Sequence, residues 1–204
     1  PGAGNVLGGQ ICADGTAWDE CFQNYSVQWR PSGGAFAAVD PTHPTYPSSV
    51  LYDPLATWTT SGFPDGNYEV RLIGQTTCGN TNSAAASFVV DNTAPTAVIT
   101  TPTSCSDLEG VVQIRGTVND AHLSGWTLQY TGGDAHSWVT IASGTGNVVN
   151  GLLANWDVRS LRTCAYTLRL VATDQSVLNC NGALHNQFEY TVAAVVNWVT
   201  LFDA

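Results

Sequence analysis

A duplication within the chain constrains its fold more than any other feature of the sequence. Two segments recur with the same spacing, Leu55–Trp58 as Leu153–Trp156 and Asn67–Leu72 as Ala165–Leu170. The offset is 98 residues in both cases, from Trp58 to Trp156 and from Tyr68 to Tyr166. A shared offset of this size indicates that a whole domain is repeated.

The repeated segments alternate large apolar and polar residues at period two, which predicts strands with one buried face. Turn sequences separate these strands at short intervals: Ser32-Gly33-Gly34, Pro64-Asp65-Gly66, Thr131-Gly132-Gly133 and Ser143-Gly144. Short strands with such turns, in units of about 100 residues, predict an all-β fold of two tandem antiparallel immunoglobulin-like β-sandwiches. The pattern resembles a repeat of secreted bacterial surface proteins and enzymes, and the resemblance covers most of both halves.

We place the first domain at residues 1–92 and the second at 93–194, with a C-terminal segment at 195–204. The linker contains Pro95, which cannot donate a ladder hydrogen bond and favours an extended residue before it. The two domains are therefore expected to follow one another through a short connector.

The first domain is expected to lack its first strand. The second domain begins with two predicted strands, Thr96–Thr100 and Val111–Gly116, whereas the first opens directly at Val6–Cys12, the counterpart of the later one. A sandwich without an edge strand exposes backbone groups and part of its core. Another segment should fill this position.

The C-terminal segment is the expected donor of that strand, because it is strongly apolar and extends roughly 33 Å as ten residues. Its candidate partner-binding residues are Val195, Val196, Trp198, Val199, Leu201 and Phe202. Insertion into a second copy by β-strand addition, repeated head to tail, predicts an extracellular filament of identical subunits. Two alternatives stay open: the segment folds back on its own domain, or upstream residues supply the strand. The competing function is an adhesive or carbohydrate-binding accessory module of a larger secreted protein.

Composition narrows the partners and the compartment. All six cationic residues are arginines, and against 16 acidic residues they leave a net charge of −10, which disfavours nucleic acid. No apolar run reaches the length of a membrane span. The cysteine count is even without a CxxC pair, and the sequence starts at Pro1 without Met, so a secreted protein with disulfides is expected.

The absence of lysine excludes the Lys–Asn isopeptide bonds of the Gram-positive pilins that this architecture resembles. Covalent reinforcement is left to cysteine, and six cysteines allow 15 connectivities. We favour a Cys105–Cys164 bond, since Cys164 replaces the turn glycine Gly66 of the first copy. Two of Cys12, Cys21 and Cys78 are expected to pair at one pole of the first domain, which leaves the third and Cys180 for a bond between domains or subunits.

No enzyme and no cofactor are predicted. The four histidines, His43, His122, His136 and His185, are scattered and form no H-E-x-x-H motif, and there is no G-x-S-x-G. Asp91, Asn92, Asp120 and Asp174 could gather around Ca²⁺ near the linker, as in the similar linkers of cadherins, although Asp and Asn are also ordinary turn residues. Of seven tryptophans, most are expected in the core, and Trp18 and Trp138 are the candidates for sugar binding.

Overall fold

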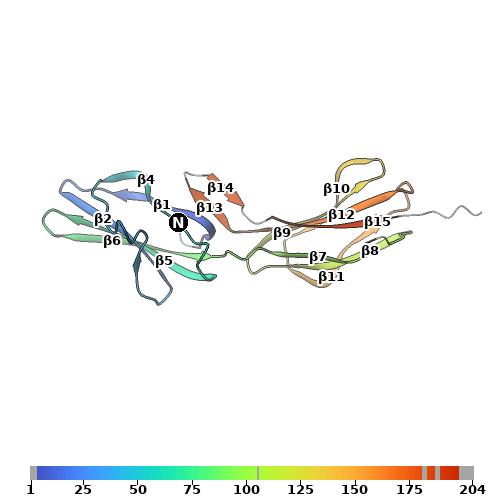
Figure 1. The fold of residues 1–204 in the computed structure, drawn as a ribbon, viewed down its shortest axis with the longest axis horizontal. Helices are drawn as coiled ribbons and strands as arrows, with labels where there is room; N and C mark the ends of the chain where they lie inside the picture. The colour runs from blue at the N-terminus through green and yellow to red at the C-terminus, as the bar shows by residue number, and fades with distance from the viewer. Residues whose placement is uncertain (1–3, 105, 181–182, 187–188, 198–204) are drawn as a thin grey trace, which may run out of the picture. The chain divides into compact units, whose positions relative to one another are not determined.

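The protein is all-β, and the computed structural model describes residues 4–104, 106–180, 183–186 and 189–197 (Figure 1). The described residues form strands and contain no helix, so none of them offers a helix long and apolar enough to cross a membrane. The chain divides into two compact units. Unit 1 comprises Pro1–Thr93 and Ser176–Gln187, and unit 2 comprises Ala94–Gln175 and Phe188–Ala204.

Unit 2 is a two-sheet sandwich in which the first strand is present. One sheet has the order β11-β8-β7 and the other β10-β9-β12-β15. The bounds of these strands are β7 Thr96–Thr101, β8 Val111–Asn119, β9 Leu123–Gly132, β10 Ala135–Gly144, β11 Val148–Asp157, β12 Ala165–Asp174 and β15 Glu189–Asn197. The predicted immunoglobulin-like arrangement is confirmed for this unit.

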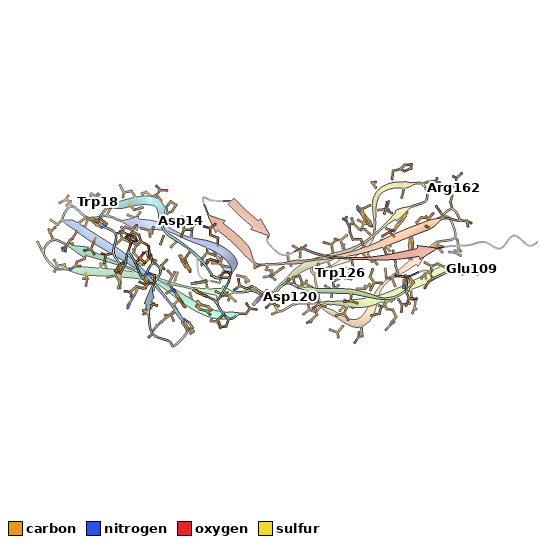
Figure 2. All side chains as sticks on the ribbon, viewed as in Figure 1. Asp14, Trp18, Glu109, Asp120, Trp126 and Arg162 are labelled. Carbon is orange, nitrogen blue, oxygen red and sulfur yellow. The ribbon has the colours of Figure 1, made fainter. Side chains whose placement is uncertain are left out.

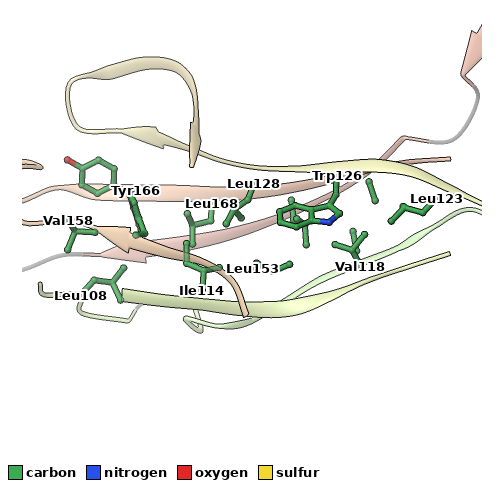
Figure 3. Packing of buried hydrophobic residues seen from close by; sticks show 14 residues of the cluster. Leu108, Ile114, Val118, Leu123, Trp126, Leu128, Leu153, Val158, Tyr166 and Leu168 are labelled. Atoms are coloured by element: carbon green, nitrogen blue, oxygen red, sulfur yellow. The ribbon is translucent and has the colours of Figure 1, made fainter. Parts of the chain in front are cut away.

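The core of unit 2 follows the alternation seen in the sequence. Leu128, Leu168 and Ile114 are fully buried, and each lies on the inward face of its strand between the two sheets (Figure 3). Trp126 and Trp156 are also buried, which confirms the core role predicted for them. Burial of alternate side chains from both sheets is the main source of stability in such a sandwich.

Unit 1 repeats this plan with one position changed. Its strands are β1 Val6–Ala17, β2 Phe22–Pro31, β3 Ala37–Ala38, β4 Val50–Thr59, β5 Gly66–Thr76 and β6 Thr81–Val90. The order β6-β5-β2-β3 matches one sheet of unit 2, and β4 pairs with β1 as β11 pairs with β8. Leu7, Ile11 and Phe88 are among the side chains buried in its core.

A hairpin from the later part of the chain also belongs to unit 1. Strands β13 Val177–Cys180 and β14 Ala183–Asn186 pair with each other, and β13 pairs in parallel with β1 at Leu7 and Ile11. The predicted second domain, 93–194, was continuous, whereas the structure assigns Ser176–Gln187 to unit 1. The sequence contains no copy of this hairpin in the first repeat, so the 98-residue pattern could not reveal it.

The last strand of unit 2 ends later than the boundary chosen from the sequence. β15 continues to Asn197 and pairs with β12, so Val195 and Val196 lie opposite Thr167 and Tyr166. The segment after β15 is 198–204, and the expected donor residues Trp198, Val199, Leu201 and Phe202 lie outside the described residues.

Candidate functional site: an open first-strand position in unit 1

Unit 2 shows what an occupied first-strand position looks like. β7 runs antiparallel to β8, with Ala97 opposite Val118 and Ile99 opposite Gly116. Ala97 is buried and Ile99 packs against the core, whereas Val98, between them, is 42% exposed. The first strand therefore closes one side of the sandwich with alternate side chains.

The backbone of β7 lies very close to β8. A methyl group added at Gly116 would stand 2.2 Å from the Val98 carbonyl oxygen and 2.9 Å from Leu153 Cδ1. Leu153 can move aside but the Val98 backbone cannot, so glycine is required at this point of β8, where β7 lies alongside.

The equivalent stretch of unit 1 follows from strand pairing. Ala13 of β1 lies opposite Ala56, and Ile114 of β8 lies opposite Ala154, which is the repeat counterpart of Ala56. Ala13, Gly15 and Ala17 therefore correspond to Ile114, Gly116 and Val118. β7 pairs with Arg115–Asn119 of β8, so a first strand placed like β7 would pair along Asp14–Trp18 of β1.

Along this stretch, one edge of β1 has no strand beside it in the described part of the chain. β4 pairs with the other edge, and β13 pairs with β1 only at Leu7 and Ile11. At Gly15 a methyl group would meet Leu55 Cδ1 at 2.9 Å and Leu55 Cγ at 3.9 Å, with no backbone atom nearby. Since Leu55 corresponds to Leu153, Gly15 lacks only the contact that β7 makes with Gly116.

A groove occupies the open position, and we call it the first-strand groove. It consists of three adjoining depressions of about 220, 170 and 400 Å³ between β1 and the strands β5 and β6. The first two share Leu72 and Ala84 in their linings, and the last two share Trp18 and Gly74. The groove therefore follows the direction of a strand past Ala13–Ala17.

Side chains that face the groove are exposed where their counterparts in unit 2 are buried. Along β12, Tyr166, Leu168, Leu170 and Ala172 are all between 0 and 3% exposed. The corresponding residues of β5 begin buried at Tyr68 and Val70 but are only half-buried at Leu72 and Gly74. On β6, Phe88 and Val90 are buried, while Ala84, which has the same inward alternation, is exposed. Part of the core of unit 1 is thus open to solvent.

One end of the groove has an aromatic and polar rim. Trp18 is 55% exposed and borders the largest depression together with Asp19, Gln75 and Asn80. Asp14 and Trp18 both lie on unit 1 in Figure 2, and Asp14 lines the opposite part of the groove. An exposed indole beside amide and carboxylate groups is a combination found in carbohydrate sites, as the sequence suggested for Trp18.

In the core of unit 1, Tyr25 of β2 bonds to β4. Its hydroxyl donates a hydrogen bond of 2.9 Å to the Leu55 carbonyl oxygen, and its ring stacks on Tyr46 at 4.9 Å between centroids. Burial raises the pKa of Tyr25, with a further increase from Tyr46, and burial also raises the pKa of Tyr46. The neutral phenol is therefore part of the folded arrangement at this position.

The cysteines do not follow the predicted pairing. Cys164 is an exposed free thiol, so the predicted bond to Cys105 is wrong in this structure. The turn before β12 is held by a different contact, because the Tyr166 hydroxyl donates to the Arg162 carbonyl oxygen at 2.9 Å. Tyr68 makes the same contact with Pro64 in unit 1.

Of the three cysteines expected at one pole of the first domain, Cys21 and Cys78 lie near each other but form no bond. Cys21 and Cys78 are free and exposed, and both border the largest depression of the groove. Cys12 is buried on β1, with its sulfur 3.3 Å from Thr57 Oγ1. The side chains of Cys105 and Cys180 lie outside the description.

The residues considered for calcium serve local hydrogen bonds within their own units. In unit 1 the Asn92 amide donates to the carbonyl oxygens of Thr60 and Phe63 at 2.7 and 3.1 Å, and Asp91 Oδ1 accepts from the Thr93 backbone. In unit 2 the Asp120 carboxylate accepts from the backbone N–H of His122 at 2.7 Å. Asp174 is fully buried at the end of β12. The hydrogen bonds of Asn92, Asp91 and Asp120 stabilise turns, and the calcium site stays a prediction.

The remaining candidate residues are distributed over the surface. His43 is exposed and lies 3.0 Å from Asp40 in a loop, and His136 is exposed at the start of β10. His185 lies outside the described side chains. Trp138 is 37% exposed, and the Arg169 guanidinium lies 4.2 Å from the centroid of its ring in a cation–π contact. The first-strand groove carries no sequence motif, and the sequence pointed to it only through the first strand that the first copy lacks.

The chain has similarity to solved structures of repeat proteins but no match by sequence. No protein-family model and no curated protein sequence matches the chain. Among solved structures, it is similar to a tetra-tandem repeat in the extending region of a large adhesion protein (20% identity, TM-score 0.38, covering 93% of this chain and 49% of that one). It is also similar to the FN1–FN3 domains of chicken CNTN1 (14% identity, TM-score 0.33, covering 95% of this chain and 62% of that one). A third similar structure is EC22–24 of mouse Cadherin-23 (14% identity, TM-score 0.28, covering 97% of this chain and 63% of that one). The chain thus spans between about half and two thirds of the length of these structures.

Proposed function

We propose that this chain is the repeating subunit of an extracellular filament. In this proposal the segment 198–204 of one subunit enters the first-strand groove of the next subunit and completes its unit 1. The observation that carries the proposal is the open edge of β1 at Asp14–Ala17, which β7 occupies at the equivalent place in unit 2.

The connection has a precedent within the chain itself. The last strand of unit 1, β6, is followed by residues 91–95 and then by β7, the first strand of unit 2. In the filament the last strand of unit 2, β15, is followed by a segment that acts as the first strand of another copy. Donor and acceptor are different surfaces, so the contact is heterologous and each added subunit presents a new acceptor.

The association must overcome a net charge of −10 on each subunit. Backbone pairing along a strand and burial of apolar side chains provide the attractive part, as in other β-strand addition complexes. Salt screens the repulsion between exposed charges over about 8–10 Å at physiological ionic strength. Assembly is therefore expected to be faster in 0.5 M salt than in 10 mM salt.

Two complementary variants test the proposal. Deletion of 198–204 removes the donor and leaves the groove open. Ala84→Leu places a larger side chain in the groove on an exposed position and leaves the donor intact. Each variant alone is expected to stay monomeric, and the equimolar mixture is expected to form a 1:1 complex in sedimentation velocity.

Ser87→Leu is the matched control, because Ser87 is exposed on β6 and does not line the groove. This variant is expected to form filaments in negative-stain images. Filaments of normal length from the chain without 198–204 would refute the proposal.

The exposed Trp18 supports a second candidate, an adhesive module that binds sugar at the end of the groove. Under this alternative the intact chain stays as discrete particles in negative-stain images. Glycan binding that is lost in Trp18→Ala would then favour it over the filament.

A further inference from the structure

The first-strand groove differs from the occupied position of unit 2 in the size of the residues at its floor. Where β8 presents Ile114 and Val118, both buried, β1 presents Ala13 and Ala17, which are 6% exposed. The pairing opposite Ala56 and Ala154 fixes this correspondence. Unit 1 therefore provides less apolar volume from its own β1 than unit 2 provides from β8.

The opposite wall of the groove does not replace the missing volume. Leu72 corresponds to Leu170, but Gly74 stands where unit 2 has Ala172. Ala84 and Ala86 line the groove on β6. Since protein interiors are close-packed, a strand that closes this groove must bring more inward side-chain volume in total than β7, whose inward residues are Ala97 and Ile99.

We propose that the groove is specific for a strand with two aromatic side chains four residues apart, and that Trp198 and Phe202 of a second copy are these residues. This inference rests on the proposed function and adds the register. Residues four apart lie on the same face of a strand. The spacing from Trp198 to Phe202 equals the spacing from Ala13 to Ala17, the two reduced positions of the floor.

The orientation follows from β7, which is antiparallel to β8. In the same orientation Trp198 lies opposite Ala17 and Thr200 opposite Gly15. Phe202 then lies opposite Ala13, one residue beyond the counterpart of Arg115, where the pairing of β7 ends. Val199 and Leu201 then face outward, as Val98 does on β7. An apolar outward residue at a first strand is thus already present in this chain.

The length of the segment fits this register. A strand of five residues opposite Ala13–Ala17 takes up roughly 17 Å at about 3.3 Å per residue. Residues 198–202 supply these five, and Asp203 and Ala204 extend beyond them. Residues 195–197, the last pairs of β15 on β12, provide the connector when they separate from that ladder.

The test measures affinity between an acceptor without 198–204 and a donor that carries Ala84→Leu, so that only one complex can form. Trp198→Ala and Phe202→Ala in the donor are each expected to weaken binding roughly 10- to 100-fold, the loss that corresponds to one buried aromatic side chain. The matched controls Val199→Ala and Leu201→Ala are expected to change binding less than about threefold, because outward side chains lose little buried area.

A size exchange adds a second readout. Ala17→Val in the acceptor restores the residue of unit 2 and is expected to weaken binding of the native donor. The smaller donor Trp198→Leu is expected to bind this acceptor better than it binds the unchanged one. Such a reversal arises from direct contact and not from a general loss of stability.

The outcomes separate this inference from the proposed function. If Val199→Ala and Leu201→Ala weaken binding while the aromatic variants do not, the register is overturned and strand donation stands. If the two aromatic variants and the two control variants of the donor all bind with equal affinity, the proposed specificity of the groove for large side chains is overturned. A filament map with the groove filled by any segment other than 198–204, or filaments from the chain without 198–204, overturns both.

Discussion

Leu72 and Leu170 occupy equivalent positions in the two units and allow the open groove to be measured as a difference in stability. Leu170 is fully buried on β12, whereas Leu72 is half-buried on β5 because the groove exposes it. Leu170→Ala removes side-chain atoms from a closed core and leaves a cavity, with an expected cost of about 2–5 kcal/mol. Leu72→Ala removes three carbons that are only partly shielded, with no closed cavity, so its expected cost is about 1 kcal/mol.

The measurement is urea unfolding of each variant in a background without 198–204, with amide hydrogen exchange on β5 and β12 to report on each unit. Filling of the groove in the assembled state is expected to raise the cost of Leu72→Ala toward that of Leu170→Ala. Equal costs for the two substitutions in the unassembled chain would refute the reasoning, because Leu72 would then be enclosed by its own polypeptide.

Three further predictions follow from individual contacts. Gly116→Ala is expected to destabilise unit 2 by about 1–3 kcal/mol, because β7 must move away. Gly15→Ala is expected to change the stability of unit 1 by less than about 1 kcal/mol. Thermal melts followed by circular dichroism would show the difference, and equal shifts in melting temperature would contradict it. Folding raises the pKa of Tyr25 above its ordinary value of 10.0. The neutral Tyr25 phenol therefore contributes fully to stability below pH 10, and this contribution is lost as the pH rises further. Melting temperatures that do not fall between pH 9 and pH 11 would argue against this. The parallel register that pairs Ile11 with Asn179 places Cys180 beside Cys12. A Cys12–Cys180 disulfide is therefore expected in peptide maps of the unreduced protein. A Cys12 peptide without a disulfide link would contradict this pairing.

Much of the fold could be predicted because the two copies agree. The alternation around Trp58 and Trp156 indicated strands with one buried face, and both side chains lie in the cores. Turn glycines such as Gly33 adopt the left-handed backbone conformation that the sequence pattern implied, with φ of 78°. These features depend on residues close together in sequence, so each copy reports them independently.

Other features depend on contacts that the repeat does not contain. The hairpin β13–β14 joins β1 across a long sequence separation, and nothing in the first copy corresponds to it. The turn at Cys164 was expected to need a disulfide in place of Gly66. The structure instead uses the hydroxyl of Tyr166, a residue that both copies share and that the sequence had assigned only to the core.

The differences between the two copies indicate more about function than either copy does alone. Gly15 and Gly116 occupy the same position of the duplicated strand and have the same neighbouring leucine, yet among the described residues only Gly116 has a strand against it. A duplicated unit whose core had simply adapted to the loss of a strand would be expected to enlarge the residues around the gap, because larger side chains would shield the exposed interior. Unit 1 has the opposite change, with alanine at positions 13 and 17 where unit 2 has isoleucine and valine. Smaller residues around an open position leave the sandwich less complete by itself, and they are what a strand with large side chains requires of its acceptor.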